Sequence, residues 1–172
     1  MANFNLYFKP IEEKLEGTQY EDVAGDNGHG TRYGLIADDL HEYQLHNTLN
    51  ITSVKDLTEE QAGAMLKALY WDYFKADYIV NQSLAEYIVD GGLNCGRILI
   101  AKYVQSILNL TTDGLIGSVT LHQINNSNQQ DLFNKLHDKR EARYAAIIAG
   151  NPSQIKFKLG WENRNNAIKF KE

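Results

Sequence analysis

Apolar side chains near the N-terminus recur every three or four residues, the spacing that gives a helix one apolar face. The positions concerned are Phe4, Tyr7, Phe8, Ile11 and Leu15. Pro10 lies inside this pattern and should either kink the helix or mark its first turn, because its ring fixes φ and removes a backbone donor. Gly17 is a natural stop, so the chain is expected to open with a helix that ends near residue 17.

A different pattern runs from Thr18 to about Ile36, where the helical period disappears. Tyrosine, threonine and valine positions alternate there with glycines at positions 25, 28, 30 and 34. Residues of these types between glycine turns are typical of short strands. The segment therefore predicts a small β-hairpin lobe after the first helix.

Helical spacing returns in the middle of the chain. A helix is predicted from Thr58 to Tyr73, and it opens with the Thr-x-x-Gln sequence of a capping box. The apolar run from Leu84 to Asn109 predicts two buried helical pieces, with interruptions at Gly91-Gly92 and at Gly96.

The sequence pattern of the C-terminal third also predicts helices. Turn-forming residues between Thr111 and Thr120 precede a short helix, and a long amphipathic helix follows from Leu132 to Ile148. Gly150 and Pro152 end that helix. The fold class predicted from these patterns is α+β and mainly α, with an N-terminal helix, a small β-hairpin lobe and a helical lobe. A length of 172 residues allows one compact domain or two small lobes that share a core.

Several single residues can be assigned from the same patterns. Trp71 and Trp161 lie on apolar patterns and are expected in the core. Cys95 lies in an apolar stretch and is expected to behave as a small buried hydrophobe. Arg140 and Arg143 are expected on a solvated helix face, although pairing with carboxylates near a cleft is the alternative.

Charge is distributed unevenly along the chain. Residues 1–60 contain four Lys or Arg against twelve Asp or Glu, and the remaining residues contain thirteen against ten. Nucleic-acid binding depends on cations that face phosphates, so the acidic N-terminal part argues against a nucleic-acid partner. It suits a neutral or mixed-charge polymer held by hydrogen bonds and ring contacts.

The sequence lacks the signals of membrane proteins, of exported proteins with a signal peptide and of metalloproteins. No apolar run approaches the roughly 18 residues that span a bilayer, so we expect no integral membrane segment. The N-terminus has no recognisable signal peptide. His41 and His46 are five residues apart, which does not place them on one helix face, and no zinc motif is present. We therefore expect no metal and no cofactor.

Glu16 is the first candidate for chemistry. A glutamate in the last turn of a helix faces the negative end of the helix dipole, which disfavours the charged carboxylate and raises its pKa. Cleavage of a glycosidic bond needs such a protonated carboxylic acid, because the departing sugar oxygen must receive a proton.

The glycine-rich turn from Asp26 to Gly34 could supply the second group. It carries the carboxylate of Asp26 and the hydroxyl of Thr31, and glycosidases need a polar partner on the other side of the scissile bond. Asp22 and Glu21 compete with Asp26 for that role, and stabilisation of the turn itself is the alternative for all three.

The chain resembles glycoside hydrolase family 108, a family of small lysozyme-like muramidases of which some are described as secretion activators. The resemblance covers nearly the whole chain, in five fragments that occur in order. The first fragment is Glu16-Gly17-x-x-Tyr20 with Asp26, Gly28, Thr31, Tyr33, Gly34 and Leu35. The others are Tyr70-Trp71; Asp90, Asn94 and Gly96; Asp113-Gly114-x-Ile116-Gly117-x-x-Thr120-Leu121; and Phe157, Gly160, Trp161 and Arg164.

The chain also departs from the family pattern in one place. Where the family commonly has Asp-Pro-Gly-Gly, this chain has Asp26-Asn27-Gly28-His29, and the loop from Glu16 to Asp26 is one residue longer. The departure leaves Glu16 unaffected and bears on the role of Asp26.

The resemblance implies a function and a set of site residues. It implies a peptidoglycan hydrolase that cleaves between N-acetylmuramic acid and N-acetylglucosamine, with Glu16 as general acid. It makes Asp26 the candidate second carboxylate. By analogy with phage-type lysozymes, it implies that Thr31 holds the attacking water. Tyr20, Tyr33 and Asn94 are candidate substrate contacts, with packing or turn structure as the alternative for each.

The resemblance also implies a domain organisation, a binding partner and a cellular location. Residues 1–90 are expected to form the lysozyme-like catalytic region, and residues 91–172 a helical peptidoglycan-binding region packed on it. The expected partner is bacterial peptidoglycan, and a holin or a secretion apparatus is the candidate route by which a protein made in the cytoplasm reaches the periplasm or the cell wall. The alternative function is a non-catalytic cell-wall-binding secretion accessory protein; an amidase or peptidase would need zinc or a Cys-His pair, and neither is evident.

Overall fold

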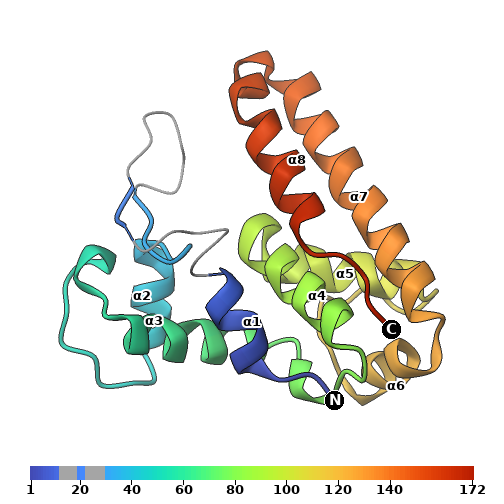
Figure 1. The fold of residues 1–172 in the computed structure, drawn as a ribbon, viewed down its shortest axis with the longest axis horizontal. Coiled ribbons are helices and arrows are strands. Elements are labelled where there is room, and N and C mark those ends of the chain that lie inside the picture. The colour runs from blue at the N-terminus through green and yellow to red at the C-terminus, as the bar shows by residue number, and fades with distance from the viewer. Residues whose placement is uncertain (12–18, 22–29) are drawn as a thin grey trace. The chain divides into compact units, whose positions relative to one another are not determined.

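The computed structural model describes residues 1–11, 19–21 and 30–172, and these divide into two units (Figure 1). The N-terminal unit comprises Asn3–Tyr73. The C-terminal unit comprises Met1–Ala2 together with Phe74–Glu172. Both are built from helices, which confirms the prediction that the chain is mainly helical.

Aromatic packing holds the N-terminal unit together. Helix α1 (Phe4–Ile11) places the rings of Phe4 and Tyr7 against Trp71, with a centroid distance of 5.6 Å in each case. Trp71 is fully buried, as predicted. Pro10 lies in the last turn of the described helix and so does not mark its start. The rest of the predicted helix, with Leu15 and Gly17, lies outside the described residues.

The helix predicted from Thr58 is confirmed, and its second half changes pitch. Helix α3 (Glu59–Leu66) starts at a capping box in which Thr58 and Gln61 each accept the other's backbone N–H. It continues into a π-helical turn, η3 (Lys67–Trp71), where the Asp72 N–H donates to the Lys67 carbonyl five residues back. A short 3₁₀ turn, η2 (Val54–Asp56), precedes α3.

Helix α2 (Ala37–Gln44) was not predicted, because its sequence is mostly polar and Leu40 is its one buried apolar residue. A buried carboxylate organises it instead. Asp39 accepts the backbone N–H of Ile36 at 3.0 Å, which caps the helix, and accepts the hydroxyl of Tyr70 at 2.6 Å. Asp39 therefore links the start of α2 to η3.

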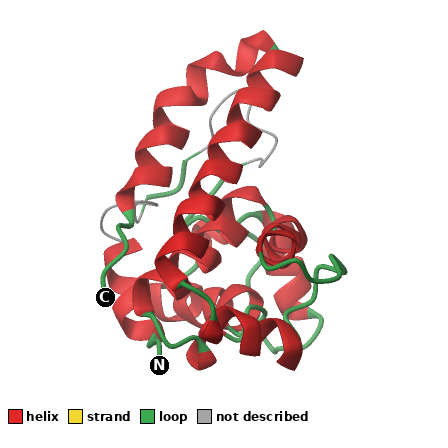
Figure 2. Ribbon diagram, turned by 90° about the vertical axis from the view of Figure 1, so that its right-hand side faces the viewer, coloured by secondary structure: helices red, strands yellow, loops and turns green. Residues whose placement is uncertain are grey.

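The predicted β-hairpin lobe is not seen in residues 19–21 and 30–36, the described part of that segment. In the described part of the chain the only β-type pairs are two isolated bridges, between Glu21 and Thr31 and between Arg32 and Leu35. Figure 2 accordingly shows no strand in the described residues. The second bridge closes a two-residue turn, because Tyr33 and Gly34 both have positive φ, 55° and 74°. Ile36 then caps α2, so the backbone enters a helix where a strand would have to continue.

The C-terminal unit is built around helix α4 (Gln82–Cys95), which is buried along most of its length and packs against η4 (Ala76–Tyr78) and α5 (Arg97–Ile107). The break expected at Gly96 is present, with φ of 98°. Gly91-Gly92 does not interrupt the helix: a Cβ at Gly92 would lie 2.3 Å from the ring of Phe74, so this glycine serves close packing. The expected boundary between residues 90 and 91 lies within α4 and stays a prediction.

The last helices follow the predicted order. Helix α6 (Ser118–Asn126) leads into the long α7 (Gln129–Gly150), and the 3₁₀ turn η5 (Pro152–Phe157) connects α7 to α8 (Lys158–Ala167). Helices α7 and α8 lie side by side (Figures 1 and 2). Trp161 is half-buried and stacks on Tyr144 at 5.3 Å between ring centroids.

Candidate functional site

Glu16 and Asp26 lie outside the described residues, as does the competing Asp22. The described residues that flank them in sequence are residues 19–21 and the segment that begins at Gly30.

Tyr20 and Thr31 are brought together on the N-terminal unit. The backbones of Glu21 and Thr31 exchange two hydrogen bonds of 2.9 and 2.7 Å. A Cβ at Gly30 would lie 2.0 Å from the Tyr20 hydroxyl oxygen, so the phenol lies directly on the Gly30 backbone. Tyr20 remains 41% exposed and Thr31 is half-buried. An exposed phenol therefore lies beside the segment that carries the Thr31 hydroxyl.

Tyr33 has a more enclosed position. Its side chain is 5% exposed, and the guanidinium of Arg32 lies 5.3 Å from its ring centroid. Arg32 also donates a hydrogen bond to the Lys55 carbonyl. The ring thus packs within the N-terminal unit, and a substrate contact for Tyr33 stays a prediction.

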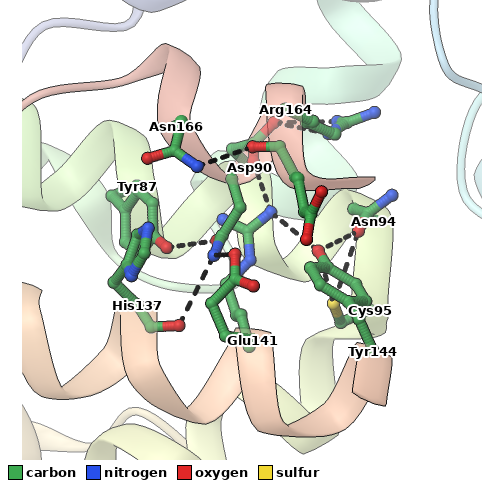
Figure 3. A network of polar contacts seen from close by, with 12 residues as sticks. Tyr87, Asp90, Asn94, Cys95, His137, Glu141, Tyr144, Arg164 and Asn166 are labelled. Carbon is green, nitrogen blue, oxygen red and sulfur yellow. Dashed lines mark hydrogen bonds and ion pairs between the residues drawn. The ribbon is translucent and has the colours of Figure 1, made fainter. Parts of the chain in front are cut away.

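The C-terminal unit contains a buried ion triad made of Asp90, Arg140 and Arg164 (Figure 3). Nη2 of Arg140 on α7 lies 2.9 Å from Oδ2 of Asp90 on α4. Nε of Arg164 on α8 lies 3.0 Å from Oδ1 of the same carboxylate. Asp90 and Arg140 are both fully buried, so one carboxylate joins three helices.

The expectation that Arg140 lies on a solvated helix face is wrong. Arg140 occupies the buried stripe of α7 that also contains Leu132, Leu136 and Tyr144. A guanidinium in that stripe requires a buried acid, and Asp90 provides one. The signal was a charged residue at a four-residue spacing among apolar positions, together with an aspartate that directly follows the apolar run Tyr87-Ile88-Val89.

The charges within the triad decide its protonation. Burial alone would raise the pKa of Asp90, but the charges of Arg164 and Arg140 and the hydrogen bonds from both outweigh burial and hold it below its ordinary value. Burial alone would lower the pKa of Arg140, but the Asp90 carboxylate raises it. The triad therefore carries a carboxylate and two guanidinium ions at neutral pH.

Polar side chains surround the triad. The Arg140 guanidinium lies 4.7 Å from the ring centroid of Tyr87, whose hydroxyl donates to Asn165. Asn165 in turn donates to Glu141 at 2.6 Å. Burial raises the pKa of Tyr87 well above its ordinary range, so its hydroxyl stays protonated. Asn165 and Glu141 were not singled out by the sequence patterns.

A relay of hydrogen bonds leads from the triad to Asn94. Nη2 of Arg140 donates to the Tyr144 hydroxyl oxygen at 3.3 Å, so that hydroxyl must direct its own proton elsewhere. Its acceptor is Oδ1 of Asn94, at 2.7 Å. This fixes the orientation of the Asn94 amide, and Figure 3 shows the amide nitrogen pointing away from Tyr144. That nitrogen donates no hydrogen bond to the described residues. Asn94 is half-buried.

Cys95 lies at the edge of the same network. It is half-buried rather than fully buried, and its Sγ lies 3.6 Å from the Tyr144 hydroxyl oxygen. The described residues contain no group of three or more His, Cys, Asp or Glu side chains that could hold a metal ion. Within the same residues, no helix combines the length and apolar character needed to cross a bilayer.

Comparison with known proteins divides the chain at Gly96. The model of the family described as glycosyl hydrolase 108 matches residues 13–96, and the model described as a predicted peptidoglycan domain matches residues 97–166. The solved structure of Brucella abortus SagA is similar with a TM-score of 0.80 and 24% sequence identity, over 96% of this chain and 90% of that chain. A comparison with curated proteins found no match.

Proposed function

The chain belongs to glycosyl hydrolase family 108, and from this premise we propose that it cleaves the glycosidic bond between N-acetylmuramic acid and N-acetylglucosamine in peptidoglycan. The match to this family supports a glycoside hydrolase, and the match to the predicted peptidoglycan domain supports peptidoglycan as its partner. The observation that carries the proposal is the family match over residues 13–96, the segment that contains Glu16, Tyr20, Asp26 and Thr31.

Glu16 acts as the general acid in this proposal. Its protonated carboxyl group gives a proton to the glycosidic oxygen as the bond to the sugar carbon breaks, and water supplies the hydroxyl for that carbon. Asp26 serves as the second carboxylate. The separation of the two carboxyl groups decides between the two stereochemical outcomes, about 5–5.5 Å for retention and about 6.5–9.5 Å for inversion.

Tyr20 and Thr31 serve the same reaction from the described part of the N-terminal unit. The exposed phenol of Tyr20, fixed on Gly30, offers a ring face to a sugar. Thr31 holds the attacking water through its hydroxyl, and its paired backbone keeps the hydroxyl in place. Tyr33 stabilises this segment through the contact of its ring with the guanidinium of Arg32.

Asn94 serves as a hydrogen-bond donor to the substrate. Its Oδ1 is already occupied by Tyr144, so its Nδ2 is the group left to face a ligand. An amide donor of fixed orientation is complementary to the acetamido carbonyl oxygen that both sugars carry. The relay from Arg140 supports this role, because an amide with a defined orientation loses less freedom when it binds.

The experiment that tests the function is the digestion of purified sacculi by the wild-type protein, by Glu16→Gln and by Glu13→Gln as a matched control. We expect new reducing ends from the wild type and from Glu13→Gln but none from Glu16→Gln. Borohydride reduction should convert the new ends to muramitol. Glucosaminitol would indicate the other glycosidic bond, and newly freed amines would indicate an amidase.

The same experiment addresses the alternative of a non-catalytic cell-wall-binding accessory protein. Binding of the wild type to sacculi without release of any product would favour that alternative. A pH profile tests the acid role separately: activity should fall as the pH rises past the point where Glu16 loses its proton. A rate that stays flat from about pH 5 to about pH 9 would contradict it.

Delivery to the cell wall belongs to the same proposal. We infer synthesis in the cytoplasm and passage to the periplasm or cell wall with the help of a holin or a secretion apparatus. Cell fractionation with and without a co-expressed holin tests this route, and equal amounts of protein outside the cytoplasm in both cases would exclude a holin.

A further inference from the structure

Three large apolar side chains face solvent on the C-terminal unit, from three neighbouring segments. Ile98 at the start of α5 is 60% exposed, Leu115 in the loop before α6 is 63% exposed, and Val119 in the first turn of α6 is 66% exposed. The loop lies directly on α5, since a Cβ at Gly114 would be 2.9 Å from Cγ2 of Ile98. We call Ile98, Leu115 and Val119 the apolar patch.

A buried glutamine holds the loop of the apolar patch rigid. Gln105 on α5 is 1% exposed, and its Oε1 accepts the Gly114 N–H at 2.9 Å. Its Nε2 lies 2.6 Å from the Asp113 carboxylate and 2.9 Å from the Leu115 carbonyl. The Leu115 N–H also donates to Asp113, at 2.8 Å. Leu115 is therefore exposed on a fixed backbone, and a rigid exposed apolar surface is a feature of binding sites.

A cation lies beside the apolar patch. Lys102 follows Ile98 by one helical turn on α5, and its Cε would lie 3.5 Å from a Cβ at Gly114. Lys102 is exposed, and no ion pair with it is recorded among the described residues. The surface thus combines aliphatic contacts with the positive charge of Lys102, while the Asp113 carboxylate of the same loop accepts hydrogen bonds from Gln105 and from the Leu115 N–H.

We propose that the apolar patch and Lys102 bind the peptide stem of peptidoglycan, an inference that rests on the proposed function for its choice of partner. Stem peptides carry alanine methyl groups, which match aliphatic side chains, and free carboxylates, which match an unpaired ammonium. A glycan strand matches this surface less well, because none of these four residues has an aromatic ring that could stack on a sugar. All four residues lie within the match to the predicted peptidoglycan domain.

The test is an NMR titration of the intact ¹⁵N-labelled protein with the synthetic stem tetrapeptide L-Ala-γ-D-Glu-meso-diaminopimelate-D-Ala. We expect the shift changes to concentrate on the amides of Ile98, Lys102, Leu115 and Val119. Leu115→Ser should weaken binding about tenfold, because an apolar contact is lost. Lys102→Gln should weaken it about two- to fivefold, as expected for an exposed ion pair, and added salt should have the same effect.

A matched control and a second ligand keep the test specific. Ile155→Ser changes an equally exposed apolar residue on η5 and should leave binding of the tetrapeptide unchanged. Shift changes with chitotetraose on the same four residues, or changes on dilution of the protein alone, would overturn the proposal in favour of a glycan site or of a second copy of the chain. Absence of tetrapeptide binding would also overturn it, and release of reducing ends from sacculi would show in that case that the proposed function still stands.

Discussion

Arg140 and Asp90 form an ion pair of 2.9 Å in which both side chains are fully buried. Asp90 belongs to the segment matched by the hydrolase family, whereas Arg140 and Arg164 belong to the segment matched by the peptidoglycan domain. The triad therefore crosses the boundary between the two family models inside one compact unit. The two matched segments therefore share one buried charge network.

Asp90→Asn should destabilise the protein strongly. The substitution leaves the guanidinium of Arg140 buried without a counter-charge, and breaking such a pair costs about 3–5 kcal/mol. The free energy of unfolding from urea denaturation measures the effect. Asp72→Asn is the control, because the ion pair of Asp72 with Lys67 is exposed and its loss should cost at most about 1 kcal/mol. Equal losses for the two variants would contradict the structural role of the triad.

Acid should remove the stabilisation that Asp90 provides. Its pKa is lower in the folded protein than in the unfolded chain, so its contribution is present above the unfolded value of about 4 and is lost as the pH falls toward the folded pKa. The melting temperature of the wild type should fall more steeply below about pH 5 than that of Asp90→Asn. Asp113, whose pKa is lowered by the Leu115 N–H and by Gln105, is present in both proteins, so it contributes to both curves. Parallel curves would show that the carboxylate does not titrate as described.

Much of the helical fold was predictable, because buried stripes and caps are local features of sequence. The capping box at Thr58 and the break at Gly96 are examples. Helix α2 was missed because a single buried apolar residue and a capping aspartate leave no periodic pattern. The β-hairpin lobe was overpredicted, since glycine-rich alternation marks turns as well as strands, and the turn at Tyr33 and Gly34 leads into a helix.

The family motifs identified several residues of the candidate site. They did not predict the contacts that determine the chemistry of those residues. Asp90 and Asn94 were identified from the resemblance, whereas the burial of Arg140 depends on a contact fifty residues away in sequence. The spacing of Arg140 among apolar positions indicates that it is buried, but no local pattern identifies Asp90 as its partner. Asn165 and Glu141 join the network for the same reason, through packing of α8 on α7.

Gly92→Ala should destabilise the C-terminal unit. The added methyl would lie 2.3 Å from the ring of Phe74, which is fully buried. Overpacking of this kind costs about 1–3 kcal/mol, measured by thermal or urea unfolding. Gly150→Ala is the matched control, because nothing lies within 4 Å of its Cβ position at the end of α7. That substitution should raise stability by up to about 1 kcal/mol through helix propensity.

Tyr144→Phe should weaken substrate binding through Asn94 without touching the sugar itself. Removing the hydroxyl takes away the 2.7 Å hydrogen bond to Oδ1 of Asn94 and leaves the longer one from Sγ of Cys95 at 3.4 Å, so the orientation of the amide is less strongly fixed. We expect KM for soluble peptidoglycan fragments to rise by about two- to tenfold, the value of one hydrogen bond, with kcat little changed. Tyr103→Phe is the control, since Lys139 contacts the face of that ring, which phenylalanine keeps.

The double variant Tyr144→Phe/Asn94→Ala distinguishes the relay from two independent contacts. Once Asn94 is gone, the hydroxyl of Tyr144 has no amide to orient, so the double variant should have the KM of Asn94→Ala alone. Fully additive effects on KM would show that Tyr144 and Asn94 act separately. Loss of stability with unchanged KM in all three variants would assign both residues to the buried network only, and Asn94 would then have to be removed from the substrate contacts.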